Sequence, residues 1–275
     1  MNPILQLPSW LFVAIFSGAT TLILVFGLSL KLKFFPELFI SAKDNTSANI
    51  MFYLVSTLLT IVLAFMLITI WRDYEDQRQN TGKEACVLGN LYRDSRALNA
   101  NNETEIQQLI IHYTKEVVED GWPAMQEERE SRRAWTAFNR LYGKVIRISP
   151  ESKAEEGVFP VMIAHMNDLA SFRRLRIIRS QTPVLPPVLE WSIILATLVT
   201  VFFTYLIRVQ SKRNEYLMVG LVGLMLGIVF SLIILLNNPY RGAARISPFP
   251  LENLLKDVYP MSDITKSKIE PTNSM

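Results

Sequence analysis

The chain has 275 residues, of which 50% are apolar and 19% are charged, and its formal net charge at pH 7 is +3. So small a net charge gives no indication of a nucleic-acid partner. The lone cysteine, Cys86, excludes an intramolecular disulfide framework and a cysteine-based metal cluster. The mean hydropathy is positive, and the apolar residues are concentrated in blocks along the chain.

Four apolar blocks reach the roughly 20 residues that a helix needs to cross a hydrocarbon core. They cover Trp10 to Leu30, Ile50 to Ile70, Val188 to Ile207 and Tyr216 to Leu236. Apart from Glu190 near one end, none contains an ionisable residue. One such block could be a buried helix of a soluble protein, but four in one chain predict an integral membrane protein surrounded by a lipid bilayer.

The first block could also be a signal peptide, which is cleaved. The preceding stretch MNPILQLPSW contains no lysine or arginine, whereas a signal peptide carries a basic segment before its apolar core. The apolar run is also longer than the usual core of a signal peptide. We therefore expect the block at 10–30 to be a retained membrane helix.

The second block continues into a charged stretch, WRDYEDQRQN, with no proline and no glycine before Gly82. Thr81, Ala85, Leu88 and Tyr92 fall on one face of the same helical register. We therefore predict that the membrane helix runs on and supplies one helix of a polar bundle. A kink is expected at Thr81 and Gly82, since small residues are common sites of helix kinks.

Three further helices are predicted in the polar region. The first opens with Asn102 and has Glu105 three residues later, which is a capping-box arrangement. The second starts near Pro123, a residue that suits a first helical turn, and its apolar face extends to Val145. The third begins near Ser152, with Glu155 as its capping partner.

The predicted fold class is therefore all-α. We predict a polytopic membrane protein with four transmembrane helices and a helical-bundle cytosolic domain inserted between helices 2 and 3. Residues 1–70 hold the first two transmembrane helices, 71–187 the bundle, and 188–236 the last two transmembrane helices. The bundle has nearly equal numbers of acids and bases, which indicates a solvated domain rather than a charged tail.

The last block carries Gly220, Gly223 and Gly227 along one helical face. Small residues allow helix backbones to approach closely in lipid. We therefore predict that these glycines pack against another helix. The other spans carry similar stripes of small or hydroxylated residues, and the alternative is that one stripe lines a pore.

The C-terminal tail covers 237–275. Its first residues, NNPYRG, end the last membrane helix, because Pro239 prevents continuation and Gly242 permits a turn. Arg241 is then expected at the membrane interface, where both the helix C-terminus and lipid headgroups favour a cation. Trp71, at the end of the second block, is expected at the interface as well. Beyond about residue 260 the composition is typical of disorder.

The even number of spans places both termini and the bundle on one side of the membrane. The bundle side carries slightly more arginine and lysine near the membrane, and cytoplasmic loops are enriched in these residues. We therefore expect the bundle and both termini in the cytoplasm, at a bacterial inner membrane or plasma membrane.

The sequence indicates no catalytic site. His112 and His165 lack partners at the spacing that a metal site or a general base needs, and no phosphate-binding glycine loop is present. We expect no enzyme activity, no metal and no cofactor. The absence of charge inside the spans argues against an ion-coupled transporter. A channel with a hydrophobic constriction and a simple membrane anchor both remain open.

Three stretches of the chain resemble the bestrophin-like domain membrane proteins of bacteria and plants, a family of unknown function that is distantly similar to bestrophin anion channels. They are EACVLGNLYRDSRAL (Glu84 to Leu98), RRLRIIRSQTPVLPPVLEW (Arg173 to Trp191) and LNNPYRGAARISPFPL (Leu236 to Leu251). With the spacing of the spans, this resemblance covers nearly the whole chain.

The resemblance implies a homo-oligomer, a pentamer in bestrophins, that conducts inorganic anions such as chloride passively. Its second membrane helix would line the pore and form a hydrophobic neck, with Ile61, Phe65 and Ile68 as the candidate neck residues. The alternative is that these side chains face lipid or a neighbouring helix. The acidic cluster that binds calcium in the animal channels is not found. The rival function is a non-conducting membrane scaffold or sensor whose bundle binds a partner.

Overall fold

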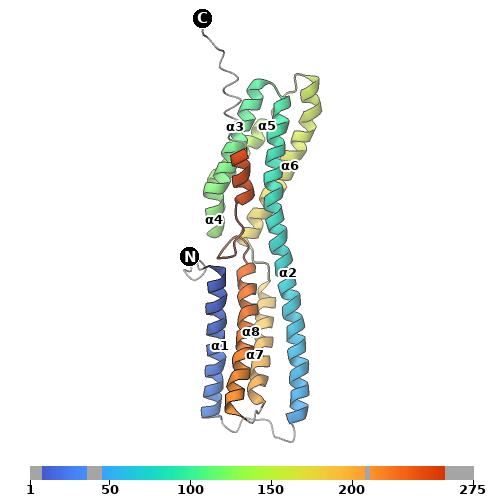
Figure 1. The fold of residues 1–275 in the computed structure, drawn as a ribbon. Coiled ribbons are helices and arrows are strands. Elements are labelled where there is room, and N and C mark those ends of the chain that lie inside the picture. The colour runs from blue at the N-terminus through green and yellow to red at the C-terminus, as the bar shows by residue number, and fades with distance from the viewer. Residues whose placement is uncertain (1–7, 36–44, 208–210, 258–275) are drawn as a thin grey trace. The chain divides into compact units, whose positions relative to one another are not determined.

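The computed structural model describes residues 8–35, 45–207 and 211–257 (Figure 1). The regular elements in these ranges are all helical, as predicted. The α-helices are α1 (Ser9–Phe34), α2 (Asn45–Asp94), α3 (Ala100–Glu116), α4 (Trp122–Gln126), α5 (Arg132–Val145), α6 (Lys153–Gln181), α7 (Pro187–Leu206) and α8 (Lys212–Leu236). Residues 249–257 are helical too. The disorder expected beyond about residue 260 falls outside the described residues.

The chain divides into two compact units. The first consists of Met1–Tyr74 and Pro183–Ala244, and the second of Glu75–Thr182 and Arg245–Met275. The helix α2 contributes to both, since it runs without a break through Thr81 and Gly82. The expected continuation of the second span into the polar region is therefore confirmed.

The first unit holds α1, α7, α8 and the apolar part of α2. These are the four helices of the described chain that are long and apolar enough to cross a membrane, which confirms the predicted number of candidate spans. Their ends differ from the predicted ones. Most notably, α8 begins at Lys212 rather than at Tyr216, so that Glu215 lies within its first turn.

Helices α1 and α8 pack in opposite directions through the predicted glycine stripe. A Cβ atom added at Gly227 would lie 2.5 Å from the Ser17 Cα atom, and one added at Gly223 would lie 2.9 Å from the Thr21 Cα atom. Neither glycine has room for a methyl group unless the backbones separate. At Gly220 the nearest atoms would be 3.9 Å away, which is an ordinary contact distance.

We expect Gly227→Ala to lower the stability of the first unit by about 1–3 kcal/mol, because the new methyl group would press on the backbone of α1. Gly220→Ala is the matched control. It brings the same gain in helix propensity, about 0.5–1 kcal/mol, without the clash. The measurement is the midpoint of thermal unfolding in detergent, followed by circular dichroism. Equal midpoints for the two variants would contradict the close approach.

The second unit is a bundle of α3, α4, α5, α6 and the C-terminal part of α2. The Ser152 side chain caps α6 and accepts a hydrogen bond from the Glu155 N–H at 3.2 Å, so the predicted start of this helix is confirmed. The prediction for α3 is wrong. Its cap is Asn99, whose side-chain oxygen accepts from the Asn102 N–H at 2.9 Å. The acceptor needed to satisfy the first turn lies one turn earlier than the Asn102–Glu105 pattern indicated.

The predicted helix from Pro123 to Val145 is also wrong, because it is two helices. Pro123 continues the helical stretch begun by α3, directly after a π-helical turn at Val117–Gly121. The chain then breaks at Glu128, which has a left-handed φ of 61°. A new helix, α5, starts after Ser131, whose hydroxyl accepts from the Ala134 N–H at 2.9 Å. The missing N–H of Pro123 is tolerated at the second position of α4, because the π-helical turn before it already departs from the α-helical hydrogen-bond pattern.

Candidate functional site

One face of α2 packs into the first unit. Leu59, Leu63 and Ile70 are buried there. They share an apolar core with residues of α7, α8 and the segment before α7, namely Leu185, Ile193, Ile233 and Leu236. At about 100° per residue, Leu63 and Ile70 lie within roughly 40° of Leu59 around the helix. The inward face of α2 is thus defined by contacts within the subunit.

The predicted neck residues lie on the opposite face of α2. Counted from Leu59, Ile61, Phe65 and Ile68 are rotated by roughly 180–240°. Their side chains are 47%, 67% and 49% exposed, so contacts within the described subunit leave each of them about half uncovered or more. The structure thus brings these residues to one surface, and this outward face also includes the exposed residues Ile50, Leu54 and Leu58.

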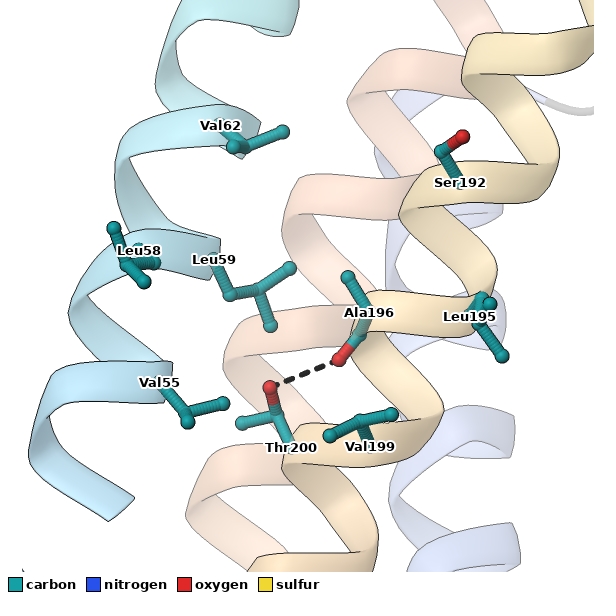
Figure 2. A pocket seen from close by; sticks show the side chains of 9 residues that line it. All are labelled: Val55, Leu58, Leu59, Val62, Ser192, Leu195, Ala196, Val199 and Thr200. Atoms are coloured by element: carbon teal, nitrogen blue, oxygen red, sulfur yellow. Dashed lines mark hydrogen bonds between the residues drawn. The ribbon is translucent and has the colours of Figure 1, made fainter. Parts of the chain in front are cut away.

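A groove of about 410 Å³ separates α2 from α7 next to this face. Figure 2 shows it between Val55, Leu58, Leu59 and Val62 of α2 and Ser192, Leu195, Ala196, Val199 and Thr200 of α7. Its two hydroxyl groups are already satisfied within α7. Thr200 donates to the Ala196 carbonyl oxygen at 2.9 Å and Ser192 to that of Val188 at 2.8 Å. The groove therefore offers an apolar surface suited to hydrocarbon or to another apolar helix.

The junction between α8 and α7 depends on Asn237, the first residue of the NNPYRG stretch. Its side-chain oxygen accepts from the Leu185 N–H at 3.0 Å, and its amide group donates to a Glu190 carboxylate oxygen at 3.0 Å. Its backbone carbonyl accepts from the Val184 N–H at 3.3 Å. Asn237 thus fixes the start of α7 to the end of α8. Glu190, the single acid of the predicted spans, has a structural partner.

The two predicted interface residues lie near the ends of chain segments of the first unit, Trp71 within α2 just before Tyr74 and Arg241 after α8. Trp71 is exposed and stacks on Tyr74, with ring centroids 6.3 Å apart. Arg241 follows α8 and its backbone N–H donates to the Asn238 carbonyl oxygen at 3.1 Å. The turn is completed by Gly242, which has a φ of 74°, so the predicted glycine turn is confirmed.

The second unit is organised around a buried ion pair. The Arg176 guanidinium of α6 donates to both carboxylate oxygens of Glu84 on α2, at 2.7 and 2.9 Å. The two side chains are 3% and 0% exposed. The Tyr113 hydroxyl donates to the same carboxylate at 2.9 Å. The guanidinium also lies over the Trp122 ring, 5.0 Å from its centroid. One carboxylate thereby joins α2, α3 and α6.

Burial raises the pKa of the Tyr113 phenol well above its usual value, and the neighbouring Glu84 carboxylate acts in the same direction. Tyr113 therefore stays protonated and remains a hydrogen-bond donor. The Trp122 indole N–H donates to the Ile246 carbonyl oxygen at 2.9 Å, which attaches the segment following Arg245 to the bundle. The side-chain polar groups of Glu84, Arg176, Tyr113 and Trp122 thus have partners within this unit, which indicates a structural role.

The histidines take no part in a metal-binding cluster. In the ranges that the structure describes, no three His, Cys, Asp or Glu residues are grouped so that they could hold a metal ion. His165 instead contacts Asp94 through its Nδ1 atom at 2.8 Å, and this pair connects α6 to the end of α2. The candidate site is therefore the outward face of α2, where the predicted neck residues Ile61, Phe65 and Ile68 lie.

Solved structures share this fold. A substituted bacterial bestrophin homologue from Klebsiella pneumoniae is 12% identical with a TM-score of 0.63, and the similarity covers 92% of this chain and 98% of that one. A substituted membrane protein is 13% identical with a TM-score of 0.67, covering 91% and 98%. Another structure of the Klebsiella homologue is 14% identical with a TM-score of 0.59, covering 92% and 98%.

A comparison with curated proteins gives no match. Residues 18–251 match the bestrophin-like domain, and this range includes parts of all four candidate spans as well as the whole polar bundle. The match agrees with the resemblance found in the three sequence stretches. The chain therefore belongs to the bestrophin-like family.

Proposed function

We propose that this protein forms a homo-oligomeric channel that conducts inorganic anions such as chloride passively through a pore lined by α2. The observation that carries the proposal is the outward face of α2. Opposite the face that packs into the subunit, it presents an apolar stripe that no contact within the described residues accounts for. A pore helix in an oligomer needs two such faces, one for its own subunit and one for the axis.

Ile61, Phe65 and Ile68 form the neck in this proposal. They follow one another at intervals of about one helical turn, so copies arranged around an axis would stack them as successive apolar rings. Rings of this kind gate by excluding water from a narrow segment. Family membership supports the same assignment, because bestrophins use their second membrane helix in this way.

The assembly and its orientation are part of the proposal. By resemblance to bestrophins the oligomer is a pentamer, and the groove between α2 and α7 provides an apolar surface next to the stripe for a neighbouring copy. The protein resides in a bacterial inner membrane or plasma membrane. The bundle and both termini face the cytoplasm, as the distribution of arginine and lysine favours. Trp71 and Arg241 lie at the membrane interface.

Chloride efflux from liposomes that contain the purified oligomer tests this function. We expect efflux from the native chain, and a several-fold increase for Phe65→Ala because the neck loses a ring from each subunit. Phe26→Ala is the matched control, since Phe26 on α1 is 64% exposed against 67% for Phe65 but lies outside the proposed pore. Its efflux should equal that of the native chain.

Two results would contradict the proposal. Equal changes in efflux for Phe65→Ala and Phe26→Ala would contradict a pore lined by α2. No efflux from a correctly assembled native oligomer would favour the rival function, a non-conducting scaffold or sensor whose helical bundle binds a partner.

A further inference from the structure

A second pocket of the first unit lies at one end of three candidate spans. It has a volume of about 410 Å³ and lies between the start of α2, the end of α7 and the start of α8. Its walls are mainly apolar and include Phe52, Met218 and Leu221, with polar contributions from Asn49, Thr204 and Glu215. It is separate from the proposed neck, and the pore proposal makes no use of it.

Glu215 is the unusual member of this lining. Its side chain is 5% exposed, yet among the described residues no hydrogen-bond donor reaches its buried Oε1 atom. A carboxylate that loses its hydration without gaining a partner is costly. Glu84, the buried acid of the ion pair described above, has a partner in Arg176. The pocket thus contains a buried acceptor for which the described residues supply no donor.

The remaining lining narrows the chemistry of that donor. The Thr204 hydroxyl already donates to the Thr200 carbonyl oxygen at 2.9 Å, so it can only accept. Together with Asn49 and Glu215 it provides few oxygens, whereas calcium takes roughly six to eight oxygen ligands, and the mainly apolar walls do not suit the waters that magnesium keeps. An anion is disfavoured by the carboxylate. An ammonium group supplies N–H donors and a positive charge, and an apolar body attached to it would fit the walls.

We propose that this pocket binds an organic ammonium ion that carries an apolar chain. The ammonium group pairs with the Glu215 carboxylate, near the Phe52 ring, whose face also attracts cations. The apolar chain lies along Met218 and Leu221. Glu215 is in the first turn of α8 and Asn49 is near the start of α2, so the pocket lies at the depth of lipid headgroups. The ammonium can come from an amine phospholipid or from a soluble alkylamine.

The test measures thermal unfolding of the full-length protein by the fluorescence of its tryptophans. In neutral detergent, hexylammonium chloride is titrated against the native chain, Glu215→Gln and Glu156→Gln, with hexanol and sodium hexanoate as probe controls. Glu156 is the matched acid, since it lies in the first turn of α6 but is exposed. We expect hexylammonium to stabilise the native chain and Glu156→Gln saturably. Hexanol and hexanoate should stabilise neither protein. For Glu215→Gln the half-saturating concentration should rise by about tenfold or more, as loss of a charged hydrogen bond implies.

A second experiment, in lipid, distinguishes an amine phospholipid from a soluble alkylamine as the source of the ammonium group. The same three proteins are compared in nanodiscs of phosphatidylethanolamine and of phosphatidylglycerol. A higher midpoint in phosphatidylethanolamine that Glu215→Gln abolishes identifies the lipid headgroup. Equal midpoints in the two lipids, with hexylammonium binding intact, identify a soluble amine.

Two results would overturn the site. One is a Glu215→Gln response that matches the native one in both arms. The other is a large loss of ligand-free stability in Glu215→Gln, which would show that Glu215 has a partner within the protein. Both readouts are independent of ion flux, so a failure of the proposed ammonium site can be distinguished from a failure of the proposed channel function.

Discussion

Arg176→Leu is expected to destabilise the bundle by about 3–5 kcal/mol, which is the usual cost of removing one partner from a buried ion pair. The substitution would leave the Glu84 carboxylate at 0% exposure with the Tyr113 hydroxyl as its remaining described partner. It would also remove the cation above the Trp122 ring. Three helices meet at this carboxylate, so the loss should spread through the whole unit. The measurement is thermal unfolding of the full chain in detergent.

Arg174→Leu is the matched control. Arg174 lies on the same helix but is exposed, and exposed substitutions usually change stability by about 0.5 kcal/mol or less. Adding Glu84→Gln to Arg176→Leu should restore part of the loss, because the buried charge disappears while an acceptor for Tyr113 remains. A double variant as unstable as the sum of the two single variants would contradict the ion-pair account, since partners in one network are not additive.

Features that arise from neighbours in sequence could be predicted without the structure. The four spans follow from apolar runs, and the continuation of α2 follows from the absence of helix breakers before Gly82. The cap of α6 follows from Ser152 and Glu155. Each depends on chemistry within one or two helical turns, which a sequence displays directly.

Local signals failed where two of them competed. Asn99 and Asn102 are both good helix caps, and nothing nearby decides between them. Asn99 caps α3, and its own N–H also donates to the Glu155 carboxylate at 2.8 Å, a contact supplied by α6. The start of α3 is therefore connected to a distant helix. The prediction at Pro123 failed for a different reason, since the π turn before it leaves no signal in the composition.

The central contacts of both units join residues far apart in sequence. Arg176 and Glu84 are separated by 92 positions, and Asn237 lies 47 positions from Glu190. No periodicity connects such pairs. The three stretches that carry the family resemblance nevertheless contain all four residues. The family pattern therefore points to the residues that build the two units. It gives no such information about Glu215, which lies outside these stretches.

The candidate neck could be predicted only as a set of alternatives. Periodicity places Ile61, Phe65 and Ile68 on one face of a helix, but a pore, a lipid surface and a helix contact all suit an apolar stripe. The structure addresses one part of this choice, because contacts within the described subunit are made by the opposite face of α2. The choice between lipid and a pore depends on other copies of the chain, and function has to decide it.

Ile68→Ser is expected to raise chloride efflux by about tenfold. A hydrophobic neck limits conduction because water and ions find no polar groups there. A ring of hydroxyls, one from each subunit, would lower the cost of wetting this segment by an amount on the order of 1–2 kcal/mol, and about 1.4 kcal/mol corresponds to a factor of ten. The measurement is the initial rate of efflux from liposomes with equal amounts of assembled protein.

Ile15→Ser is the matched control, and it distinguishes a pore-lining position of Ile68 from a lipid-facing one. Ile15 on α1 is 51% exposed and Ile68 is 49% exposed, so both changes place a hydroxyl on a similarly uncovered surface of a span. If Ile68 faced lipid, both variants would lose a little stability and neither would conduct faster. If Ile68 lines the neck, only Ile68→Ser gains conductance. The increase should then be largest where water is scarcest, which makes the same substitution at Ile61 a measure of how far the dry segment extends along α2.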